Sequence, residues 1–499
     1  MRVAQLSKSR RTRVSRIVNI PSPVGGMNTR DNPFDLPPQD AIIIWDAFPR
    51  ADYIETRGGN AEYATGTTGN IKTLATYSAL SGTESMFAAT SSGIYNATSS
   101  GAVGAAVIAR TDGKHQWTMF GDGTNNWLCM FNGVDKPAFY NGTTWTAVDG
   151  VSVPAITGVT TTGLIGACSY QGRLFLIEKD RLKFWYMPAG VVGGAAVAFD
   201  LAAQCSRGGY LMAALPFTYD GGSGMDDVIV FVTSMGEAIC YKGTDPGTAA
   251  NWVKLGTYFI GKPIGRRCMT KLGGDVLVLT ENGIVKMSAA LNGVVDDRAF
   301  YISDKIRNRL TSYIRSYGTV FGWEMIVYSK ENALILNIPT VEDSTSLQMV
   351  MNVSTGAWCE FTVWDSGTYG ILNSQLYFSE LTKTYVAWSG TTDRGTAITC
   401  YAQTANFSVG SKEKKQVKVI TINGQAASSS TPISIGLFLD GVSANYASTS
   451  TFPAGTASVN FSAFGGTGSY VGISISVNGS GVKFYWYATS LVFESGGLI

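Results

Sequence analysis

The chain has 499 residues, of which 45% are hydrophobic, 11% aromatic and 15% charged, with 58 glycines and a formal net charge of +2. This composition excludes a disordered chain, which needs high charge and few aromatic residues. It also excludes a strongly basic nucleic-acid binder that gains its affinity by neutralising phosphates. Many glycines and aromatic residues with few charges are typical of short strands joined by tight turns, so we expect an all-β protein.

The N-terminal segment, residues 1–18, is a basic arm. It carries Arg2, Lys8, Arg10, Arg11, Arg13 and Arg16 and no acidic residue. Two interpretations remain open: a solvated tail, or an arm that docks on a neighbouring subunit or on nucleic acid. The arm lacks the apolar run of a signal peptide, and no stretch of the chain approaches about 18 consecutive apolar residues. We therefore expect a soluble protein made in the cytoplasm.

Residues 19–64 are expected to form a Pro- and Gly-rich strap followed by the first strand. Five of the 15 prolines fall between Pro21 and Pro38. Proline fixes φ and removes a backbone donor, so the strap should be extended and should make few ladder hydrogen bonds. The apolar run over residues 41–45 predicts the first true strand.

Residues 65–399 repeat one pattern, in which two short apolar runs flank a turn. The run 127–131 meets 137–140 across Asn132-Gly133, and the run 276–279 meets 284–287 across Asn282-Gly283. The first six turns are spaced by about 40 to 55 residues, the length of one four-stranded propeller blade. The pattern predicts a β-propeller of six or seven blades. Consecutive β-sandwiches remain the alternative, because they also place turns at short intervals.

One helix, residues 303–317, is expected to be inserted in the propeller. Ser303 is its predicted N-cap and Gly318 its C-cap glycine, while Ile306, Leu310 and Ile314 share one face. Lys305, Arg309 and Arg315 should then face solvent or a neighbouring subunit.

After about residue 400 the composition shifts toward Ser, Thr and Gly, with alternating apolar runs and no helical period. Residues 400–499 are therefore predicted to form a separate β-sandwich. Lys412, Lys414 and Lys415, which precede its first strand, are interpreted as a solvated domain junction.

The sequence offers few residues for catalysis. His115 is the single histidine, which argues against a Ser-His-Asp triad or a zinc site, and no phosphate-binding loop is present. The seven cysteines are scattered and are expected to be buried, reduced thiols. We expect no catalytic residue, no metal, no cofactor and no enzymatic activity.

The order of these parts resembles the tail nozzle proteins, also called tail tubular or tail hub proteins, of short-tailed bacteriophages (podoviruses). The resemblance is carried by residues 20–28 (IPSPVGGMN), 36–41 (LPPQDA), 45–49 (WDAFP) and 302–306 (ISDKI), and by the pair FAAT and GIY at 87–90 and 93–95. It covers most of the chain in order, although each motif is short.

The resemblance implies a structural virion protein with no cofactor. Six copies would form a ring in the distal short tail that extends and closes the DNA channel. The implied partners are further copies, an adaptor or head–tail connector, tail fibre, spike or needle proteins, and DNA passing through the lumen without sequence-specific binding. Residues expected at an adaptor or neighbour contact are Arg10, Arg11, Arg13, Arg16, Pro21, Pro23, Pro37 and Pro38. A receptor- or carbohydrate-binding tail spike or adhesin is the alternative.

Overall fold

The computed structural model describes residues 15–220, 225–293, 297–462, 464–478 and 481–495. The chain divides into two compact units. One unit is Gly58–Gly395, and the other combines Met1–Arg57 with Thr396–Ile499. The N-terminal strap thus belongs to the same unit as the C-terminal segment, and we describe each unit by itself.

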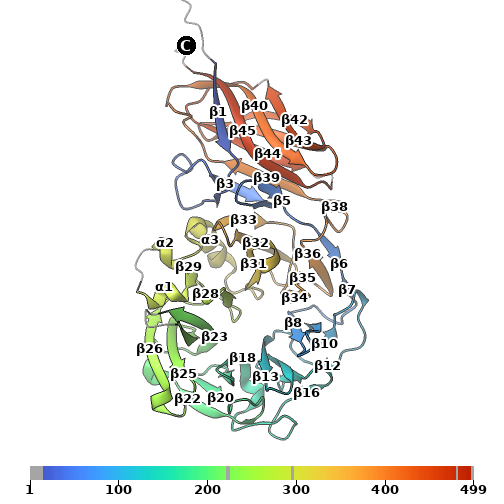
Figure 1. Cartoon of the computed structure of the whole chain (residues 1–499), viewed down its shortest axis with the longest axis vertical. Coiled ribbons are helices and arrows are strands. Elements are labelled where there is room, and N and C mark those ends of the chain that lie inside the picture. The colour runs from blue at the N-terminus through green and yellow to red at the C-terminus, as the bar shows by residue number, and fades with distance from the viewer. Residues whose placement is uncertain (1–14, 221–224, 294–296, 463, 479–480, 496–499) are drawn as a thin grey trace, which may run out of the picture. The chain divides into compact units, whose positions relative to one another are not determined.

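The unit Gly58–Gly395 is a β-propeller of seven blades within the described residues, so the predicted fold is confirmed (Figure 1). Each blade is an antiparallel sheet in which consecutive strands pair. The first three blades are β8 (Thr73–Ser78), β9 (Glu84–Ala89), β10 (Gly93–Asn96) and β12 (Ile108–Ala109); β13 (Gln116–Gly121), β14 (Asn126–Phe131), β15 (Ala138–Tyr140) and β16 (Trp145–Ala147); and β18 (Leu164–Tyr170), β19 (Arg173–Glu178), β20 (Lys183–Tyr186) and β22 (Val197–Asp200).

Blades 4 to 7 follow the same order along the chain. They are β23 (Leu211–Asp220), β24 (Met225–Thr233), β25 (Glu237–Gly243) and β26 (Trp252–Phe259); β27 (Met269–Leu272), β28 (Asp275–Thr280) and β29 (Gly283–Lys286); β30 (Glu324–Tyr328), β31 (Ala333–Val341), β32 (Thr345–Asn352) and β33 (Ala357–Phe361); and β34 (Tyr369–Leu372), β35 (Gln375–Glu380) and β36 (Lys383–Ala387) with β6 (Asn60–Glu62). The sheet of blade 7 continues into β37 (Thr392–Asp393) and β38 (Thr396–Ala397). Two further pairs of short strands form small sheets of their own: β7 (Ala64–Thr65) with β11 (Gly101–Ala102), and β17 (Ile156–Thr157) with β21 (Gly194–Ala195).

The ring of blades closes through a strand from the beginning of the unit. β6 pairs antiparallel with β36, with Asn60 opposite Ala387 and Glu62 opposite Tyr385. The first strands of successive blades also contact one another, from β8 with β13, β13 with β18, β18 with β23, β23 with β27 and β27 with β30, to β34 with β8. The first strand is therefore the inner strand of each blade.

Aromatic side chains fill the spaces between blades, which explains their abundance in the sequence. Between blades 3 and 4, Phe184 stacks on Phe231 with ring centroids 4.4 Å apart, and Tyr241 stacks on Trp252 at 5.1 Å. Each such ring buries a large apolar area, worth about 1.5 to 3 kcal/mol.

The helical insertion differs in part from the prediction. It contains α1 (Met287–Leu291), α2 (Asp297–Phe300), the 3-10 turn Asp304–Ile306 and α3 (Arg307–Tyr317). Ser303 does not cap a helix, because its Oγ accepts a hydrogen bond from the backbone N–H of Ile284 at 2.9 Å. Gly318 has φ −59°, so it does not adopt the left-handed C-cap conformation.

The apolar face of α3 is confirmed, since Leu310 and Ile314 are buried. Arg309 does not face solvent as expected: its Nε donates to Glu360 Oε2 of β33 at 2.6 Å. α1 and α3 both contact β29, the last strand of the three-stranded blade 5. Further 3-10 turns span Thr161–Gly163, Ala202–Gln204, Ala249–Asn251 and Ser329–Glu331.

The second unit is a β-sandwich built from both ends of the chain. One sheet runs β4 (Ala47–Pro49), β5 (Ile54–Thr56), β45 (Phe484–Ser495), β40 (Lys415–Ala426) and β43 (Gly455–Ser462), with β1 (Ser15–Pro21) also pairing with β45. The other contains β2 (Gly26–Met27), β3 (Asp40–Trp45), β39 (Thr399–Thr404), β44 (Val471–Asn478), β41 (Thr431–Leu439) and β42 (Val442–Phe452). Buried and exposed positions alternate along β40, as expected for a sheet with one face in the core.

The strap makes more ladder contacts than its prolines suggested. β1 lies antiparallel to β45 along its whole length, from Ser15 opposite Glu494 to Pro21 opposite Ala488. The expected boundary between arm and strap therefore falls inside a strand. The strand predicted over 41–45 is confirmed as β3.

Two buried cations stabilise the sandwich from within. Arg57 Nε lies 2.6 Å from Asp46 Oδ1, and both side chains are almost fully buried. Lys415, expected in a solvated junction, is also buried, and its Nζ donates to the carbonyls of Ser411, Glu413 and Ser469. Burial lowers the pKa of Lys415.

Among the described residues, no helix is long and apolar enough to cross a membrane.

Candidate functional site

The starts of the inner strands meet at one end of the propeller axis. All inner strands run in the same direction, so the residues that precede or begin them gather at one end of the ring. Thr73, His115, Arg267, Glu324 and Thr368 occupy these positions next to β8, β13, β27, β30 and β34. We call these five residues the axial cap.

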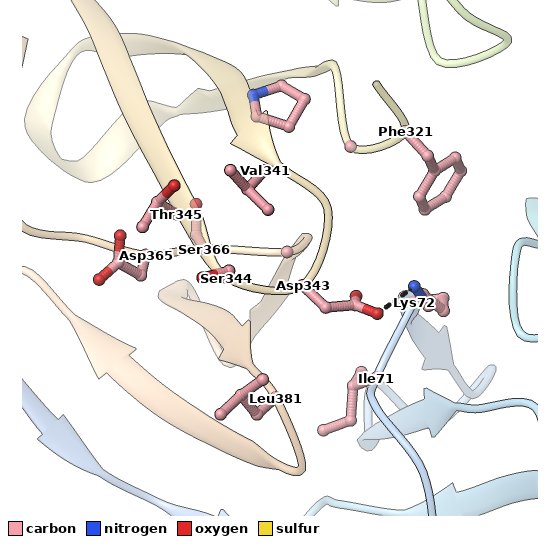
Figure 2. A pocket seen from close by; sticks show the side chains of 13 residues that line it. Ile71, Lys72, Phe321, Val341, Asp343, Ser344, Thr345, Asp365, Ser366 and Leu381 are labelled. Atoms are coloured by element: carbon pink, nitrogen blue, oxygen red, sulfur yellow. Dashed lines mark hydrogen bonds and ion pairs between the residues drawn. The ribbon is translucent and has the colours of Figure 1, made fainter. Parts of the chain in front are cut away.

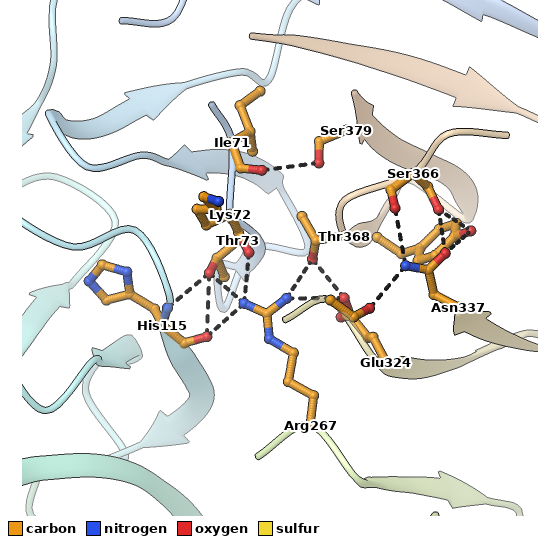
Figure 3. Close-up of polar contacts among 12 residues, drawn as sticks. Ile71, Lys72, Thr73, His115, Arg267, Glu324, Asn337, Ser366, Thr368 and Ser379 are labelled. Atoms are coloured by element: carbon orange, nitrogen blue, oxygen red, sulfur yellow. Dashed lines mark hydrogen bonds and ion pairs between the residues drawn. The ribbon is translucent and has the colours of Figure 1, made fainter. Parts of the chain in front are cut away.

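Arg267 is the centre of the axial cap (Figure 3). Its Nη1 donates to Glu324 Oε2 at 3.2 Å and to Thr368 Oγ1 at 3.1 Å. Its Nη2 donates to Thr73 Oγ1 at 2.7 Å and to the carbonyls of Lys72 and His115 at 2.8 and 3.1 Å. One guanidinium thus joins blades 1, 2, 5, 6 and 7.

The planar guanidinium suits this position because it presents five N–H donors in a fixed geometry. Only 8% of the Arg267 side chain is exposed, and Glu324 supplies the opposite charge. Charge-assisted hydrogen bonds are about twice as strong as neutral ones. The axial cap therefore both fastens five blades and fills this end of the propeller axis.

His115 contributes to the axial cap through its backbone. Its N–H donates to Thr73 Oγ1 at 3.0 Å, and its carbonyl accepts from Arg267. The imidazole is buried, and Nδ1 has no hydrogen-bond partner among the described residues. Burial lowers the pKa of His115 to about 4, so the ring is neutral near pH 7. This geometry assigns His115 a structural role in the cap.

A second group of charges covers the cap. The turn between β31 and β32 carries Glu342 and Asp343, which bind Lys72 Nζ at 2.7 and 2.5 Å. Glu342 also binds Lys114 Nζ at 2.8 Å. This turn of blade 6 therefore reaches across to blade 1 and to the segment that leads into blade 2.

Phe321 lies among the cations of this group. Lys114 Nζ is 4.4 Å from its ring centroid, and the Arg267 guanidinium carbon is 5.1 Å away. Such contacts are worth about 0.5 to 2 kcal/mol. Burial alone would lower the pKa of Lys72, but its hydrogen bonds to Asp343 and Glu342 outweigh burial and raise the pKa.

A narrow pocket opens beside these residues (Figure 2). Lys72, Asp343 and Phe321 lie at one side of it, and Thr345, Asp365 and Ser366 lie at the other. Asp365 Oδ1 accepts a hydrogen bond from the backbone N–H of Ser346 at 3.3 Å, and burial raises the pKa of the Asp365 carboxyl. The pocket is thus a recess of mixed polar and apolar lining at the capped end of the propeller.

Within the described ranges, no group of three His, Cys, Asp or Glu side chains is placed to hold a metal ion. The structure describes all seven cysteines, and none forms a disulfide. Burial raises the pKa of Cys168, Cys240 and Cys268 to about 12, so these thiols are protonated and unreactive near pH 7.

The described residues among those expected at a partner contact belong to the sandwich unit. Arg10, Arg11 and Arg13 lie outside the described residues. Arg16 is exposed in β1, where it pairs with Phe493, and Pro21 ends the same strand. Pro23 is buried, whereas Pro37 and Pro38 are exposed in the segment before β3. These positions do not converge on one site, and their role in a contact stays a prediction.

Sequence reasoning missed the axial cap. Its members come from five blades, and no local period connects Thr73 with Arg267 or Thr368. One signal was available: polar residues recur just before or at the start of the inner strands, in a chain that is only 15% charged. These polar residues can be recognised as one group only after the inner strand of each blade has been identified.

No protein-family model matches the chain, and no curated protein matches it. Solved structures that are similar in fold include exo-β-1,3-galactanase from Phanerochaete chrysosporium, at 9% identity over 77% of this chain and 97% of that one, with a TM-score of 0.26. Raptor from Chaetomium thermophilum is 11% identical over 66% of this chain and 30% of that one, with a TM-score of 0.37. The β-propeller domain of Cps50 (Swd1) from Myceliophteria thermophila is 10% identical over 65% of this chain and 99% of that one, with a TM-score of 0.39.

The comparisons do not bear out the expectation that the chain has no enzymatic activity, because the similar structures include a glycoside hydrolase. A single histidine and the lack of a phosphate-binding loop exclude particular mechanisms, but glycoside hydrolysis needs only two carboxyl groups. At these TM-scores and identities the similar structures carry no argument about the activity of this chain.

Proposed function

We propose that the chain is a structural subunit of a short phage tail, in which six copies form a nozzle ring that extends and closes the DNA channel below the adaptor. The supporting observation is the arrangement of the chain. A Pro-rich N-terminal segment and the C-terminal segment build one β-sandwich unit, and the whole propeller lies between them in the sequence.

The axial cap supports an assembly of several copies. Arg267 and its five acceptors fill one end of the propeller axis. A DNA duplex therefore has no path along the axis of a single propeller, and a passage must form between copies. A heterologous interface that closes on itself produces such a ring.

The charge of the chain also supports a conduit. A wall rich in lysine and arginine would bind phosphates and slow the passage of DNA. The chain carries 38 basic and 36 acidic residues. In the described part, many of them pair with each other, as Lys72 does with Glu342 and Arg394 with Glu380.

Native mass spectrometry of the purified chain, alone and with a candidate adaptor ring, tests this function. We expect a species of six copies, either for the chain alone or once the adaptor is added. In purified virions, we expect immunogold labelling to detect the chain at the tip of the tail. A single copy under both conditions would overturn the proposal, as would a virion that lacks the chain. Cleavage of capsular polysaccharide by the single copy would instead indicate a tail spike.

A further inference from the structure

A cavity of about 340 Å³ lies between blades 3 and 4. Blade 3 contributes Tyr170 and Gln171, where the inner strand β18 ends. Blade 4 contributes Asp227, near the start of β24, and residues from the end of β25, the start of β26 and the loop between these two strands. Because the inner strands begin at the axial cap, the cavity lies at the opposite end of the propeller. Its volume is within the range of roughly 300 to 1,000 Å³ that is typical of small-molecule sites.

A glycine leaves room in the wall that blade 4 presents to blade 3. Alternate side chains of a strand point to the same side. Ile229 and Phe231 of β24 lie in the core between the two blades, so Asp227 faces blade 3 as well. At the end of the neighbouring strand, Gly243 has φ +124°, and a Cβ atom there would lie 1.9 Å from the carbonyl oxygen of Asn251. Only glycine fits this position, and no side chain from it fills the cavity.

The carboxylate of Asp227 is held in place by uncharged donors. Gln171 Nε2 donates to Oδ2 at 3.0 Å, and Thr218 Oγ1 donates to Oδ1 at 3.2 Å. The Tyr170 hydroxyl donates to the backbone carbonyl of Asp227 at 2.7 Å. A carboxylate has about four lone-pair sites, two on each oxygen. Each oxygen of Asp227 therefore keeps acceptor capacity for a ligand.

Arg173 of β19 fastens the loop of blade 4 to blade 3 beside the cavity. Its Nε donates to the carbonyl of Thr244 at 2.9 Å, and its Nη2 lies 3.3 Å from Asp245 Oδ1. Both partners belong to the loop between β25 and β26. The two walls are thus fixed relative to each other before any ligand arrives, which lowers the entropic cost of binding.

The lining of the cavity fits a neutral ligand with several hydroxyl groups. Asp227 and Lys242 are its only charged residues, one of each sign, so the lining has no net charge. Within the described residues, nothing hydrogen-bonds to Gln171 Oε1 or to the side-chain amide of Asn251, although both residues line the cavity. Val253, which is 45% exposed, adds an apolar surface. A sugar ring combines such hydroxyl groups with an apolar face of C–H groups.

We propose that this cavity binds one ring of a neutral sugar. Two adjacent hydroxyl groups of the ring donate to the two carboxylate oxygens of Asp227, and a third exchanges a hydrogen bond with the amide of Asn251. Hydrogen bonds to a carboxylate are about twice as strong as neutral ones. The sugar is either free or part of a polysaccharide. The whole site belongs to one copy of the chain, so it does not depend on the ring proposed above.

Saturation-transfer difference NMR of the purified chain tests the site with D-glucose, D-galactose and D-mannose, and with their polymers dextran, galactan and mannan. We expect at least one of the three sugars to bind, with a dissociation constant of about 1 mM. Tighter binding of its polymer per sugar ring would identify a polysaccharide as the source, and equal binding a free sugar. If none of the six probes binds, the proposal is overturned.

Two sugar acids test the charge of the ligand. D-glucuronate and D-galacturonate carry a carboxylate that Asp227 repels, so each should bind at least about tenfold more weakly than its neutral sugar. Tighter binding of the acids would contradict a site for neutral sugars.

Three variants locate the binding site. Asp227→Asn removes the charge and keeps the size of the side chain, so affinity should fall at least about tenfold. Ala250→Trp, at an exposed position of the wall, should fill the cavity and abolish binding. The matched control is Asp180→Asn, in the exposed turn between β19 and β20, which should bind like the unmodified chain. Circular dichroism should be the same for all four proteins.

The variants also separate this site from the nozzle. Sugar binding that survives both Asp227→Asn and Ala250→Trp would place the sugar elsewhere and overturn the assignment. A chain that binds the sugar at this site but stays a single copy with the adaptor would retain the sugar site and contradict only the nozzle.

Discussion

The two units of this chain bury cations in different ways. In the propeller, Arg267 shares its N–H groups among acceptors from several blades, so one side chain holds together segments that lie far apart in the sequence. In the sandwich, Arg57 pairs with Asp46 from the neighbouring strand region, and Lys415 binds carbonyl groups. The comparison shows that one cation in the propeller joins several blades, whereas each buried cation of the sandwich binds groups of one or two segments.

The largest effect should follow from Arg267→Met. This change removes the cation beside Glu324, which keeps only the hydroxyl of Thr368 as a donor at 2.8 Å. Removal of one partner from a buried ion pair costs about 3 to 5 kcal/mol. Hydrogen–deuterium exchange should accelerate in the inner strands β8, β30 and β34 and remain unchanged in β40 and β45.

The neighbouring Arg266→Met is the matched control for this change. Arg266 precedes the cap residue in sequence and is half-buried, so its replacement should leave the exchange of all these strands close to that of the unmodified chain. Equal destabilisation by the two changes would contradict the central role of Arg267.

Arg57→Met is the corresponding change in the sandwich. It leaves Asp46 buried without its cation, at a cost of about 3 kcal/mol. Exchange should now accelerate in β3 and β39 and not in the inner strands of the propeller. A uniform loss of protection in both units would show that the two regions do not respond separately, and the comparison above would fail.

The effect of pH on His115 should be smaller and confined to acid conditions. The pKa of the folded imidazole is lowered to about 4, below its unfolded value of 6.5. The unfolded chain therefore binds a proton first, so stability is present above pH 6.5 and is lost as the pH falls toward 4. The loss amounts to at most about 3 kcal/mol.

The variant His115→Phe separates the effect of this imidazole on acid stability from the effect of the carboxyl groups. Urea unfolding at pH 7 and pH 4.5 should show a smaller acid loss in the variant than in the unmodified chain. If the free energy of unfolding falls equally with pH in the two proteins, His115 does not take up a proton on unfolding.

The smallest effect should come from Arg309→Gln at the helix α3. The guanidinium donates to Glu360 at 2.6 Å, but about a quarter of the Arg309 side chain is exposed. We expect a loss of about 1 to 2 kcal/mol, read as faster exchange in α3 and β33. Arg315→Gln, on the exposed side of the same helix, serves as the control and should have no measurable effect.

The propeller could be predicted from the sequence because its contacts are local. Asn132-Gly133 predicted a hairpin turn, and the structure confirms it: Gly133 has φ +77°, and Asn132 Oδ1 accepts from the N–H groups of Val134 and Asp135. Each such turn joins two strands that pair directly, so apolar runs on both sides were sufficient to identify the blades.

The strand that the N-terminal strap adds to the sandwich, the strand that closes the propeller and the axial cap could not be predicted in the same way. β1 pairs with β45, and β6 pairs with β36, across most of the length of the chain. No local pattern identifies such a partner, and the prolines of the strap suggested fewer ladder bonds than β1 makes. Arg267 likewise becomes recognisable as a central residue only after the ring has brought Thr73 and Thr368 beside it.

Electron cryomicroscopy of the chain assembled with its adaptor is the most direct test of the proposed function. We expect a ring of six copies around one lumen, with each propeller closed at its axial cap and the passage lying between propellers. A single copy bound to the adaptor, or density for DNA along the axis of one propeller, would contradict the proposal.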